Sequence, residues 1–348
     1  MRMNFIQVIL GFTFAFILSL LLVGIMRKLA LHLNILDLPD GSRKLQRSPV
    51  PYLGGMGLII AFLICISLGI YFVSPSLSIL EDSANLLAPC LIMALVGLWD
   101  DLKNLSPQFR LIIQIILGLV CSISITFGST SGNITNSESL NILLTIIWVV
   151  GITNAVNFFD NYDGGAAIAT TVTAIGMATY SALTGQEYIM AVNVILIGAL
   201  LGFFYWNRRP ARVYMGDAGA LFVGMLLASL AVRIDPVAPS KFVSLCVPLL
   251  FLALPILDTC TVLICRLRNG RSPLQGGLDH ISHRLANMGM NANKILLVIA
   301  IIGLQFQVIA VATYFANNLI CIMLIALFAA EMILILQKLL KVRVEYES

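Results

Sequence analysis

The sequence has little charge for its length: only 11% of its 348 residues are Asp, Glu, Lys or Arg, whereas soluble domains carry about 25%. Histidine occurs three times, and none of the seven cysteines stands in a CxxC pair. These shortages argue against a soluble domain, a disulfide framework and a zinc site. Because the chain also lacks an internal repeat and a low-complexity linker, we expect a single domain over residues 1–348.

Apolar residues make up 59% of the chain, and the mean hydropathy is +0.97. They gather in about eleven stretches near the roughly 20 residues that cross a bilayer. We therefore expect an all-α polytopic membrane protein, with the cysteines as packing thiols inside or at the ends of its spans. The first stretch is too long for a cleaved signal peptide. The expected spans are 5–26, 53–73, 84–99, 109–127, 140–157, 165–183, 189–206, 218–234, 242–265, 295–315 and 318–338.

The basic residues predict the orientation of these spans. Eighteen of the 21 Lys and Arg residues fall in alternate loops, beginning after the first span, and three fall on the other side. Since cytoplasmic loops carry the excess of basic residues, the N-terminus should lie outside and the C-terminus in the cytoplasm. The pI near 8.7 then reflects topology and does not indicate a nucleic-acid partner. The expected cytoplasmic loops are 27–52, 99–109, 157–164, 207–217 and 266–294.

Two adjacent carboxylates, Asp100 and Asp101, end an apolar run in the segment GLWDDLKNL, residues 97–105. Neighbouring carboxylates repel each other unless a cation or a proton relieves them. We interpret the relieving cation as a metal that arrives together with a phosphate. The segment therefore marks a candidate cation site at the end of a membrane span.

A second polar cluster, NAVNFFDNYDGG at 154–165, places Asn154, Asn157, Asp160 and Asp163 at three-residue steps. Residues at this spacing share a helix face. Their amide and carboxylate oxygens suit Mg²⁺ or the hydroxyls of a ribose or sugar. The alternative is a helix end that runs into an Asp-Gly turn.

Two further motifs are rich in polar side chains. In RVYMGDAG, Asp217 stands between two glycines at the start of a span, which suits either close approach to a ligand or a helix N-cap. Tyr214 could stack on a base, although aromatic residues are common at membrane interfaces. In DHISHRL, His280 and His283 share a helix face beside Arg284, which suits binding of a diphosphate.

The basic segment GSRKLQRSPVPYLGG, residues 41–55, ends in a Pro-Gly entry to the second span. Most of its charges are typical membrane anchors. Lys44 or Arg43 is a candidate substrate ligand, because Gly54 and Gly55 would let the loop lie close to a site. The segment GALLG at 198–202 has the spacing of a helix-packing motif.

From about residue 40 to 290 the chain resembles the polyprenyl-phosphate N-acetylhexosamine-1-phosphate transferases, also called glycosyltransferase family 4. Six segments carry the resemblance: RKLQRSPVPYLGG, GLWDDLKNLSP, NAVNFFDNYDG, RVYMGDAG, PILDT and DHISHRL. The resemblance implies transfer of a sugar-1-phosphate from a UDP-sugar to undecaprenyl or another polyprenyl phosphate, with release of UMP. It also implies a Mg²⁺ or Mn²⁺ cofactor and a site on the cytoplasmic face of the cell membrane.

By this resemblance each motif residue acquires an expected role. Asp100 and Asp101 become the catalytic acids, and Asp217 with Asn157 the metal ligands. The substrate-binding residues are Lys44, Arg110, Asp160, Asp163, Tyr214, His280, His283 and Arg284. The number and sense of the spans fit the branch that uses UDP-GlcNAc for the first membrane step of cell-wall and polysaccharide synthesis. The chain could also form a homodimer, which the resemblance does not decide.

Departures from the family pattern leave the sugar open. Ser282 replaces the middle His of His-x-His-His-Arg, and Asn161-Tyr162 replaces Gly-Leu after Asp160. Another UDP-N-acetylhexosamine, or UDP-MurNAc-pentapeptide, is therefore the alternative donor. The branch that uses the pentapeptide has a different His motif, which disfavours that donor.

Two other functions, that of a second kind of phosphotransferase and that of a transporter, fit the residues less well. A CDP-alcohol phosphotransferase would continue DGGAA with Arg, Gly and two Asp residues, which the chain lacks at those positions. A transporter would place ionisable groups near the midplane and show an inverted repeat. Asp258, in PILDT, is the one deeper acid, and we interpret it as structural or as support for the site.

Overall fold

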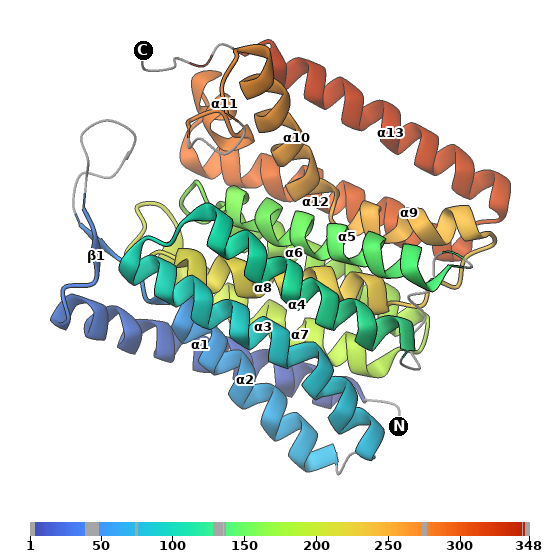
Figure 1. The fold of residues 1–348 in the computed structure, drawn as a ribbon, viewed down its shortest axis with the longest axis horizontal. Helices are drawn as coiled ribbons and strands as arrows, with labels where there is room; N and C mark the ends of the chain where they lie inside the picture. The colour runs from blue at the N-terminus through green and yellow to red at the C-terminus, as the bar shows by residue number, and fades with distance from the viewer. Residues whose placement is uncertain are drawn as a thin grey trace.

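The computed structural model describes residues 4–38, 49–73, 76–127, 135, 137–272, 277–342 and 344. Within these residues the chain forms thirteen α-helices and one two-stranded antiparallel ribbon (Figure 1). The elements are α1 (Phe5–His32), β1 (Leu36–Asp37), β2 (Val50–Pro51), α2 (Gly54–Val73), α3 (Leu77–Lys103), α4 (Pro107–Phe127), α5 (Glu138–Phe159), α6 (Gly165–Leu183), α7 (Glu187–Asn207), α8 (Gly216–Arg233), α9 (Lys241–Phe251), α10 (Ala253–Arg268), α11 (Ile281–Asn287), α12 (Ala292–Phe315) and α13 (Asn318–Leu340).

Ten of the described helices are long and apolar enough to cross a membrane, and the bent pair α9–α10 counts as an eleventh span. This confirms the expected all-α polytopic fold. The expected span at 242–265 is not continuous, because α9 and α10 meet at 74°. Pro255, in the first turn of α10, has no N–H to continue the helix. The carbonyl of Phe251 accepts hydrogen bonds from Thr173 and Gln307 instead, as a broken helix in a membrane requires.

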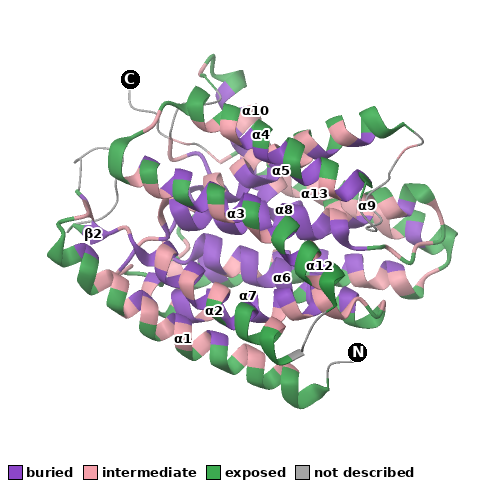
Figure 2. Ribbon diagram, turned by 60° about the horizontal axis from the view of Figure 1, so that its bottom comes forward, coloured by how far each residue is buried: buried purple, intermediate pink, exposed green. Residues whose placement is uncertain are grey.

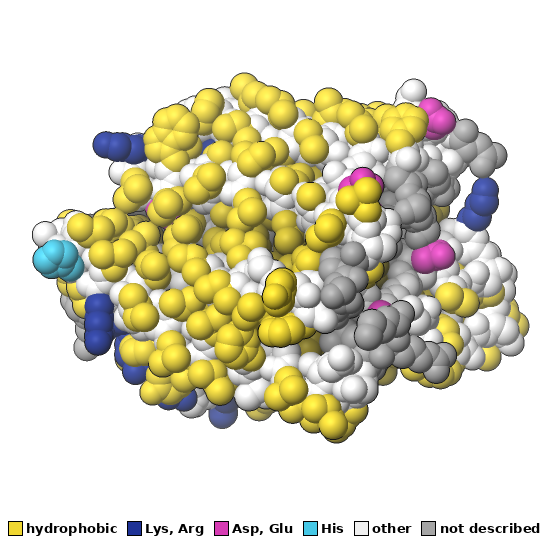
Figure 3. Space-filling model, turned by 90° about the horizontal axis from the view of Figure 1, so that it is seen from below, with side chains coloured by type: hydrophobic (Ala, Val, Ile, Leu, Met, Phe, Trp, Pro, Cys, Tyr) yellow, Lys and Arg dark blue, Asp and Glu magenta, His cyan; other side chains and the backbone are white. Residues whose placement is uncertain are grey.

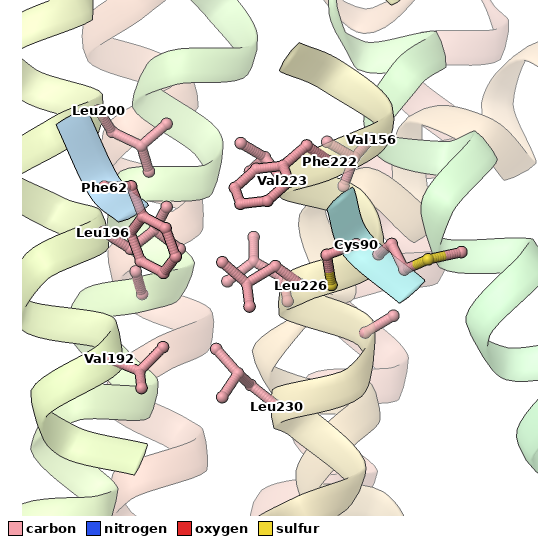
Figure 4. Close-up of a cluster of buried hydrophobic side chains, with 14 of the residues drawn as sticks. Phe62, Cys90, Val156, Val192, Leu196, Leu200, Phe222, Val223, Leu226 and Leu230 are labelled. Atoms are coloured by element: carbon pink, nitrogen blue, oxygen red, sulfur yellow. The ribbon is translucent and has the colours of Figure 1, made fainter. Parts of the chain in front are cut away.

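Helix α8 lies at the centre of the bundle. Of its most apolar window, 89% is buried, against 6% for α13, and the burial colours show the same contrast between core and periphery (Figure 2). In the core, Phe222 and Leu226 of α8 belong to one buried cluster with Phe62 of α2 and Leu196 of α7 (Figure 4). Neighbouring helices therefore pack against α8 on several sides and hold it in place.

The outer surface of the bundle is apolar. A broad band of hydrophobic side chains covers the face seen in Figure 3, and most of the Lys and Arg side chains visible there lie toward one end. Large exposed hydrophobic residues include Phe14 and Leu21 on α1, and Leu327 and Leu334 on α13. Such a surface would be insoluble in water, so the chain is a multi-pass membrane protein.

Glycines let several helices approach at backbone distance. A Cβ on Gly198 or Gly202 would lie 2.4 or 2.5 Å from the carbonyl oxygen of Phe12 or Phe16 on α1. This contact supports the helix-packing interpretation of GALLG. On α2, the Gly54 and Gly55 amides donate to the carbonyls of residues 214 and 215, at 3.1 and 3.0 Å. These bonds tie the start of α2 to the segment that precedes α8.

The candidate functional residues gather at one end of the bundle, which we call the site end. It contains the β1–β2 ribbon, the C-terminal ends of α3 and α5, the N-terminal ends of α4 and α8, and α11 (Figure 1). The basic loop between β1 and β2, with Lys44, lies outside the described residues. The 266–294 segment contains α11.

Candidate active site

The two adjacent acids of α3 face different partners. Asp100 is buried, and its carboxylate accepts the Leu105 amide at 2.6 Å and a guanidinium nitrogen of Arg110. Asn104 ends α3 in the left-handed conformation, with φ of 52°, and so turns the chain back toward α4. The turn thus places Arg110, on the first turns of α4, against the acid that ends α3.

The Asp101 carboxylate binds the N-terminus of α8. Its two oxygens accept the backbone N–H groups of Asp217 and Ala218, at 2.8 and 3.1 Å. These amides have no partner within their own helix, so Asp101 acts as an N-cap supplied by a different helix. Two glycines make room for this contact. A Cβ on Gly97 would lie 2.4 Å from the Asp217 carbonyl oxygen, and a Cβ on Gly216 2.6 Å from the Asp101 carboxylate.

Side chains from two other helices, α4 and α5, bind the Asp217 side chain. One carboxylate oxygen accepts the Asn157 side-chain amide at 2.7 Å, and the other accepts Arg110 Nη1 at 2.6 Å. The same guanidinium nitrogen contacts Asp100. Arg110 therefore bridges an acid of α3 and an acid of α8, which lie more than a hundred residues apart in the sequence. The sequence-based interpretation gave Asp217 the alternatives of ligand and N-cap; in the structure Asp101 is the residue that caps α8.

The turn after α5 brings two more carboxylates to the site end. Burial raises the pKa of the Asp160 carboxyl well above its usual range, and the charges of Asp217, Asp101 and Asp163 add to this effect. Asp163 accepts the Ala211 amide at 3.1 Å. Burial raises the pKa of Asp163 as well, although this hydrogen bond and the charge of Arg209 oppose the rise. Among the residues that the structure describes, the acids near Asp217 thus outnumber the cations that face them.

The Asn residues of the second cluster separate. Asn157 binds Asp217, but Asn154 lies one turn deeper and exchanges hydrogen bonds with Gln114 of α4, at 2.6 and 3.3 Å. The predicted shared face of the two amides is therefore divided between the site and the packing of α4 on α5.

Tyr214 lies in the segment that leads into α8. Its amide donates to the Pro51 carbonyl at 2.8 Å, and its ring centroid is 6.4 Å from that of Tyr52 in a tilted arrangement. Tyr52 donates to Asp37 at 2.5 Å. Burial and the charges of Asp163 and Asp37 raise the pKa of Tyr214, so its hydroxyl stays protonated. The β ribbon thus fixes the predicted base-stacking tyrosine beside the acids.

The two histidines occupy the start of α11. Asp258 of α10 binds the His280 ring at 2.7 Å and accepts the Ile281 amide at 2.7 Å, which supports the interpretation of Asp258 as a supporting residue. The His283 ring packs edge-on against Tyr162 at 6.3 Å. Burial, followed by the charge of His280, lowers the pKa of His283 to about 4, so this ring is neutral near pH 7.

A hydrogen bond joins this helix to the acid-bearing turn: Ser282 donates to Asn161 at 2.6 Å. These two residues are the departures from the family motifs, and in this chain they bind each other. Tyr162, between Asn161 and Asp163, has the Arg209 guanidinium 5.1 Å from its ring centroid. The loop before α8, the turn after α5 and α11 therefore form one continuous polar layer.

Arg284 has a different environment from the other predicted substrate ligands. It is fully buried, and its guanidinium donates to the backbone carbonyls of Asp279, Leu339 and Val342. It therefore faces the end of α13 in this structure, and its predicted contact with a diphosphate stays a prediction. Lys44 lies outside the described residues.

Sequence reasoning missed several of these partners. Asn161, Ser282 and Arg209 belong to the polar layer. In the sequence, Asn161 and Ser282 stood out only as departures from the family motifs, and Arg209 only as a basic residue. For Asp258 the signal was present, because an acid inside an apolar span is usually paired. Its partner His280 could not be inferred, since the two lie 22 residues apart on separate helices.

The chain is similar in sequence to several known proteins. The sequence profile described as Glycosyl transferase family 4 matches residues 83–235, a stretch that contains the acids of α3, α5 and α8. A Bacillus subtilis protein, described as a probable undecaprenyl-phosphate N-acetylglucosaminyl 1-phosphate transferase, is 28% identical over 316 residues, which cover 88% of this chain and 85% of the relative.

These two matches confirm the resemblance of the chain to glycosyl transferase family 4. Another relative in the family is the decaprenyl-phosphate N-acetylglucosaminephosphotransferase of Mycobacterium tuberculosis, 27% identical over 84% of this chain and 78% of its own. The phospho-N-acetylmuramoyl-pentapeptide-transferase of Streptococcus thermophilus is 30% identical over 56% of this chain and 63% of its own. These matches confirm the resemblance, and the residue roles that it implies stay predictions.

Proposed function

We propose that the protein transfers N-acetylglucosamine-1-phosphate from UDP-GlcNAc to a polyprenyl phosphate, with release of UMP, at the cytoplasmic face of the cell membrane. The convergence of Asp100, Asp217 and Arg110 at one end of a membrane bundle carries the proposal. Two of the relatives that cover more than four fifths of this chain are described as N-acetylglucosamine phosphotransferases acting on polyprenyl phosphates. The excess of Lys and Arg in the loops at this end supports the cytoplasmic assignment.

In this reaction an oxygen of the lipid phosphate attacks the phosphorus that carries the sugar. The new P–O bond forms as the bond between this phosphorus and the bridging oxygen breaks. UMP leaves with the bridging oxygen and its negative charge. Asp100 orients the acceptor phosphate or accepts its proton, and Arg110, held between Asp100 and Asp217, supplies a cation for the phosphate. Tyr214 stacks on the uracil, and His280 and His283 donate hydrogen bonds to the diphosphate and the sugar.

The residues fit a divalent metal as cofactor. Among the described residues no group of three or more His, Cys, Asp or Glu side chains forms a ready metal shell. Mg²⁺, however, is usually bound through one or two carboxylates, with substrate phosphates and waters as further ligands. The raised pKa of Asp160, caused by burial and by the charges of Asp217 and Asp101, reflects an excess of carboxylates. Asp217 would hold Mg²⁺ or Mn²⁺ beside Asn157, and the ion would neutralise the diphosphate.

The experiment that tests this proposal measures UMP release by the purified protein in detergent. Undecaprenyl phosphate and Mg²⁺ are present, and UDP-GlcNAc, UDP-GalNAc, UDP-glucose and UDP-MurNAc-pentapeptide are offered separately. We expect UMP only when lipid and UDP-GlcNAc are both present. Release from the pentapeptide donor alone would assign the other substrate branch, and no release from any donor would contradict the proposal.

A further inference from the structure

Helix α13 is the most loosely packed span, yet its last turn is firmly attached. Along its 23 residues only Cys321 and Leu339 are buried. Leu339 belongs to a buried cluster with Ile281 and Leu285 of α11. Figure 1 shows α13 along one edge of the bundle, with its C-terminal end beside α10 and α11. The attachment is therefore local, and it lies at the site end.

Arg284 of α11 makes this attachment. Its Nη1 donates to the Leu339 and Val342 carbonyls, both at 2.9 Å, and its Nε donates to the Asp279 carbonyl at 2.8 Å. The last carbonyls of a helix have no partner within the helix, and a cation there also offsets the negative end of the helix dipole. All three acceptors are backbone groups, so Arg284 joins three segments irrespective of their side chains.

The helix that Arg284 fixes is short and carries the two histidines. Helix α11 has seven residues, too few to be stable without tertiary contacts. Asp258 anchors its first turn through His280 and Ile281, as described above. Arg284 anchors the rest of α11. Asp279, whose carbonyl accepts from Arg284, is itself held by two hydrogen bonds from the buried Arg266 to its carboxylate, each 2.8 Å.

We propose that Arg284 is a positioning residue, which clamps the end of α13 to α11 and thereby holds His280 and His283 at the site. Two of its three guanidinium nitrogens, Nε and Nη1, donate to backbone carbonyls, and the third, Nη2, is buried without a partner among the described residues. The side chain is fully buried, whereas a diphosphate ligand needs donors that face the substrate. The last turn of α13 thus becomes part of the site's support. The catalytic part of this inference rests on the proposed function.

The test combines a side-chain variant with two truncations. Arg284→Met removes the donors but keeps much of the apolar stem. A chain that ends at Gln337 removes both carbonyl acceptors. A chain that ends at Val344 keeps both as peptide carbonyls and serves as the matched control. The readouts are kcat and KM for UDP-GlcNAc, and the hydrogen exchange of peptides covering residues 281–287.

We expect Arg284→Met and the Gln337 truncation each to lower kcat about 10- to 100-fold, as displaced catalytic groups do. KM should change little, α11 should exchange faster in both, and the Val344 truncation should match the wild type. The combined variant should be no worse than the poorer single variant, because both remove the same contacts.

Three results would overturn the proposal: wild-type kcat and wild-type exchange in the Gln337 truncation, a large rise in KM confined to Arg284→Met, or additive losses in the combined variant. Should Arg284→Met fail to fold, the two truncations still decide the question. Hydrogen exchange needs no substrate, so an inactive wild type would count against the proposed function and not against the clamp.

Discussion

Asp101 and Asp217, on helices α3 and α8, are joined because an Asp101 carboxylate oxygen accepts the backbone amide of Asp217 at 2.8 Å. The other Asp101 oxygen accepts the next amide, that of Ala218. The side chain of one predicted catalytic acid thus fixes the backbone of the predicted metal ligand. Of the adjacent pair, Asp100 faces Arg110 and Asp101 caps α8, which explains why two carboxylates stand side by side.

Replacement of Asp101 should therefore lower stability as well as activity. Asp101→Ala leaves two amides at the start of α8 without their acceptor, at a cost of about 0.5–2 kcal/mol. Asp101→Asn keeps one acceptor oxygen and should lie between the alanine variant and the wild type. Thermal unfolding in detergent measures this order. Wild-type stability of Asp101→Ala would show that the cap has no energetic role.

Replacement of Asp100 should lower kcat and leave the binding of the donor intact. In Asp100→Asn the charge that faces Arg110 is lost, and we expect kcat to fall about 10²- to 10⁴-fold, the usual contribution of a positioned acid or base. Binding of UDP-GlcNAc, measured by calorimetry, should persist. Glu81→Gln, on the exposed far end of the same helix, is the control. Near-normal turnover of Asp100→Asn would remove this residue from the mechanism.

The contact between α3 and α8 depends on Gly97. In Gly97→Ala the new Cβ would meet the Asp217 carbonyl at 2.4 Å, so the helices must separate, at a cost of about 1–3 kcal/mol. We expect lower thermal stability and a large loss of UMP release. Gly69→Ala, whose Cβ meets nothing within 4 Å, should behave as the wild type. If the two variants proved equally active, the close approach would not matter.

The sequence predicted the spans and the polar motifs, but it could not predict how the motifs combine. Composition and periodicity suffice for transmembrane helices, because a bilayer admits few alternatives. The contact of Arg110 with Asp217 spans 107 positions, and the contact of Ser282 with Asn161 spans 121. Such pairs depend on how helices pack, which no local pattern encodes. The break at Leu252 was missed because a proline does not always break a membrane helix.

The placement of Arg284 shows the same limit. As a basic residue beside two histidines, it is indistinguishable in sequence from a phosphate ligand. Only the structure shows that the end of α13 lies against it, 55 residues further along the chain.

Acidification should destabilise the protein through His283. The pKa of this ring is about 4 in the folded protein because of burial and the charge of His280; an ordinary histidine has a pKa near 6.5. Between these values the unfolded chain binds more protons, so the free energy of unfolding should fall as the pH falls from about 6.5 to about 4. Asp160, with its raised pKa, contributes in the opposite direction.

The effect of His283 is therefore isolated by comparison with His283→Gln, whose unfolding temperature is measured beside that of the wild type across this pH range. We expect the wild type to lose stability relative to the variant as the pH falls. A constant difference between the two would show that the ring is not held neutral.

The most direct test of the account is the rate of UMP release by Asp217→Asn beside that of the wild type, with undecaprenyl phosphate, UDP-GlcNAc and Mg²⁺ at saturation. The substitution keeps the shape of the side chain and removes the charge on which Asn157 and Arg110 converge. We predict a rate at least about 100-fold lower, with the protein still folded. A rate close to that of the wild type would contradict the claim that this cluster of carboxylates carries out the transfer.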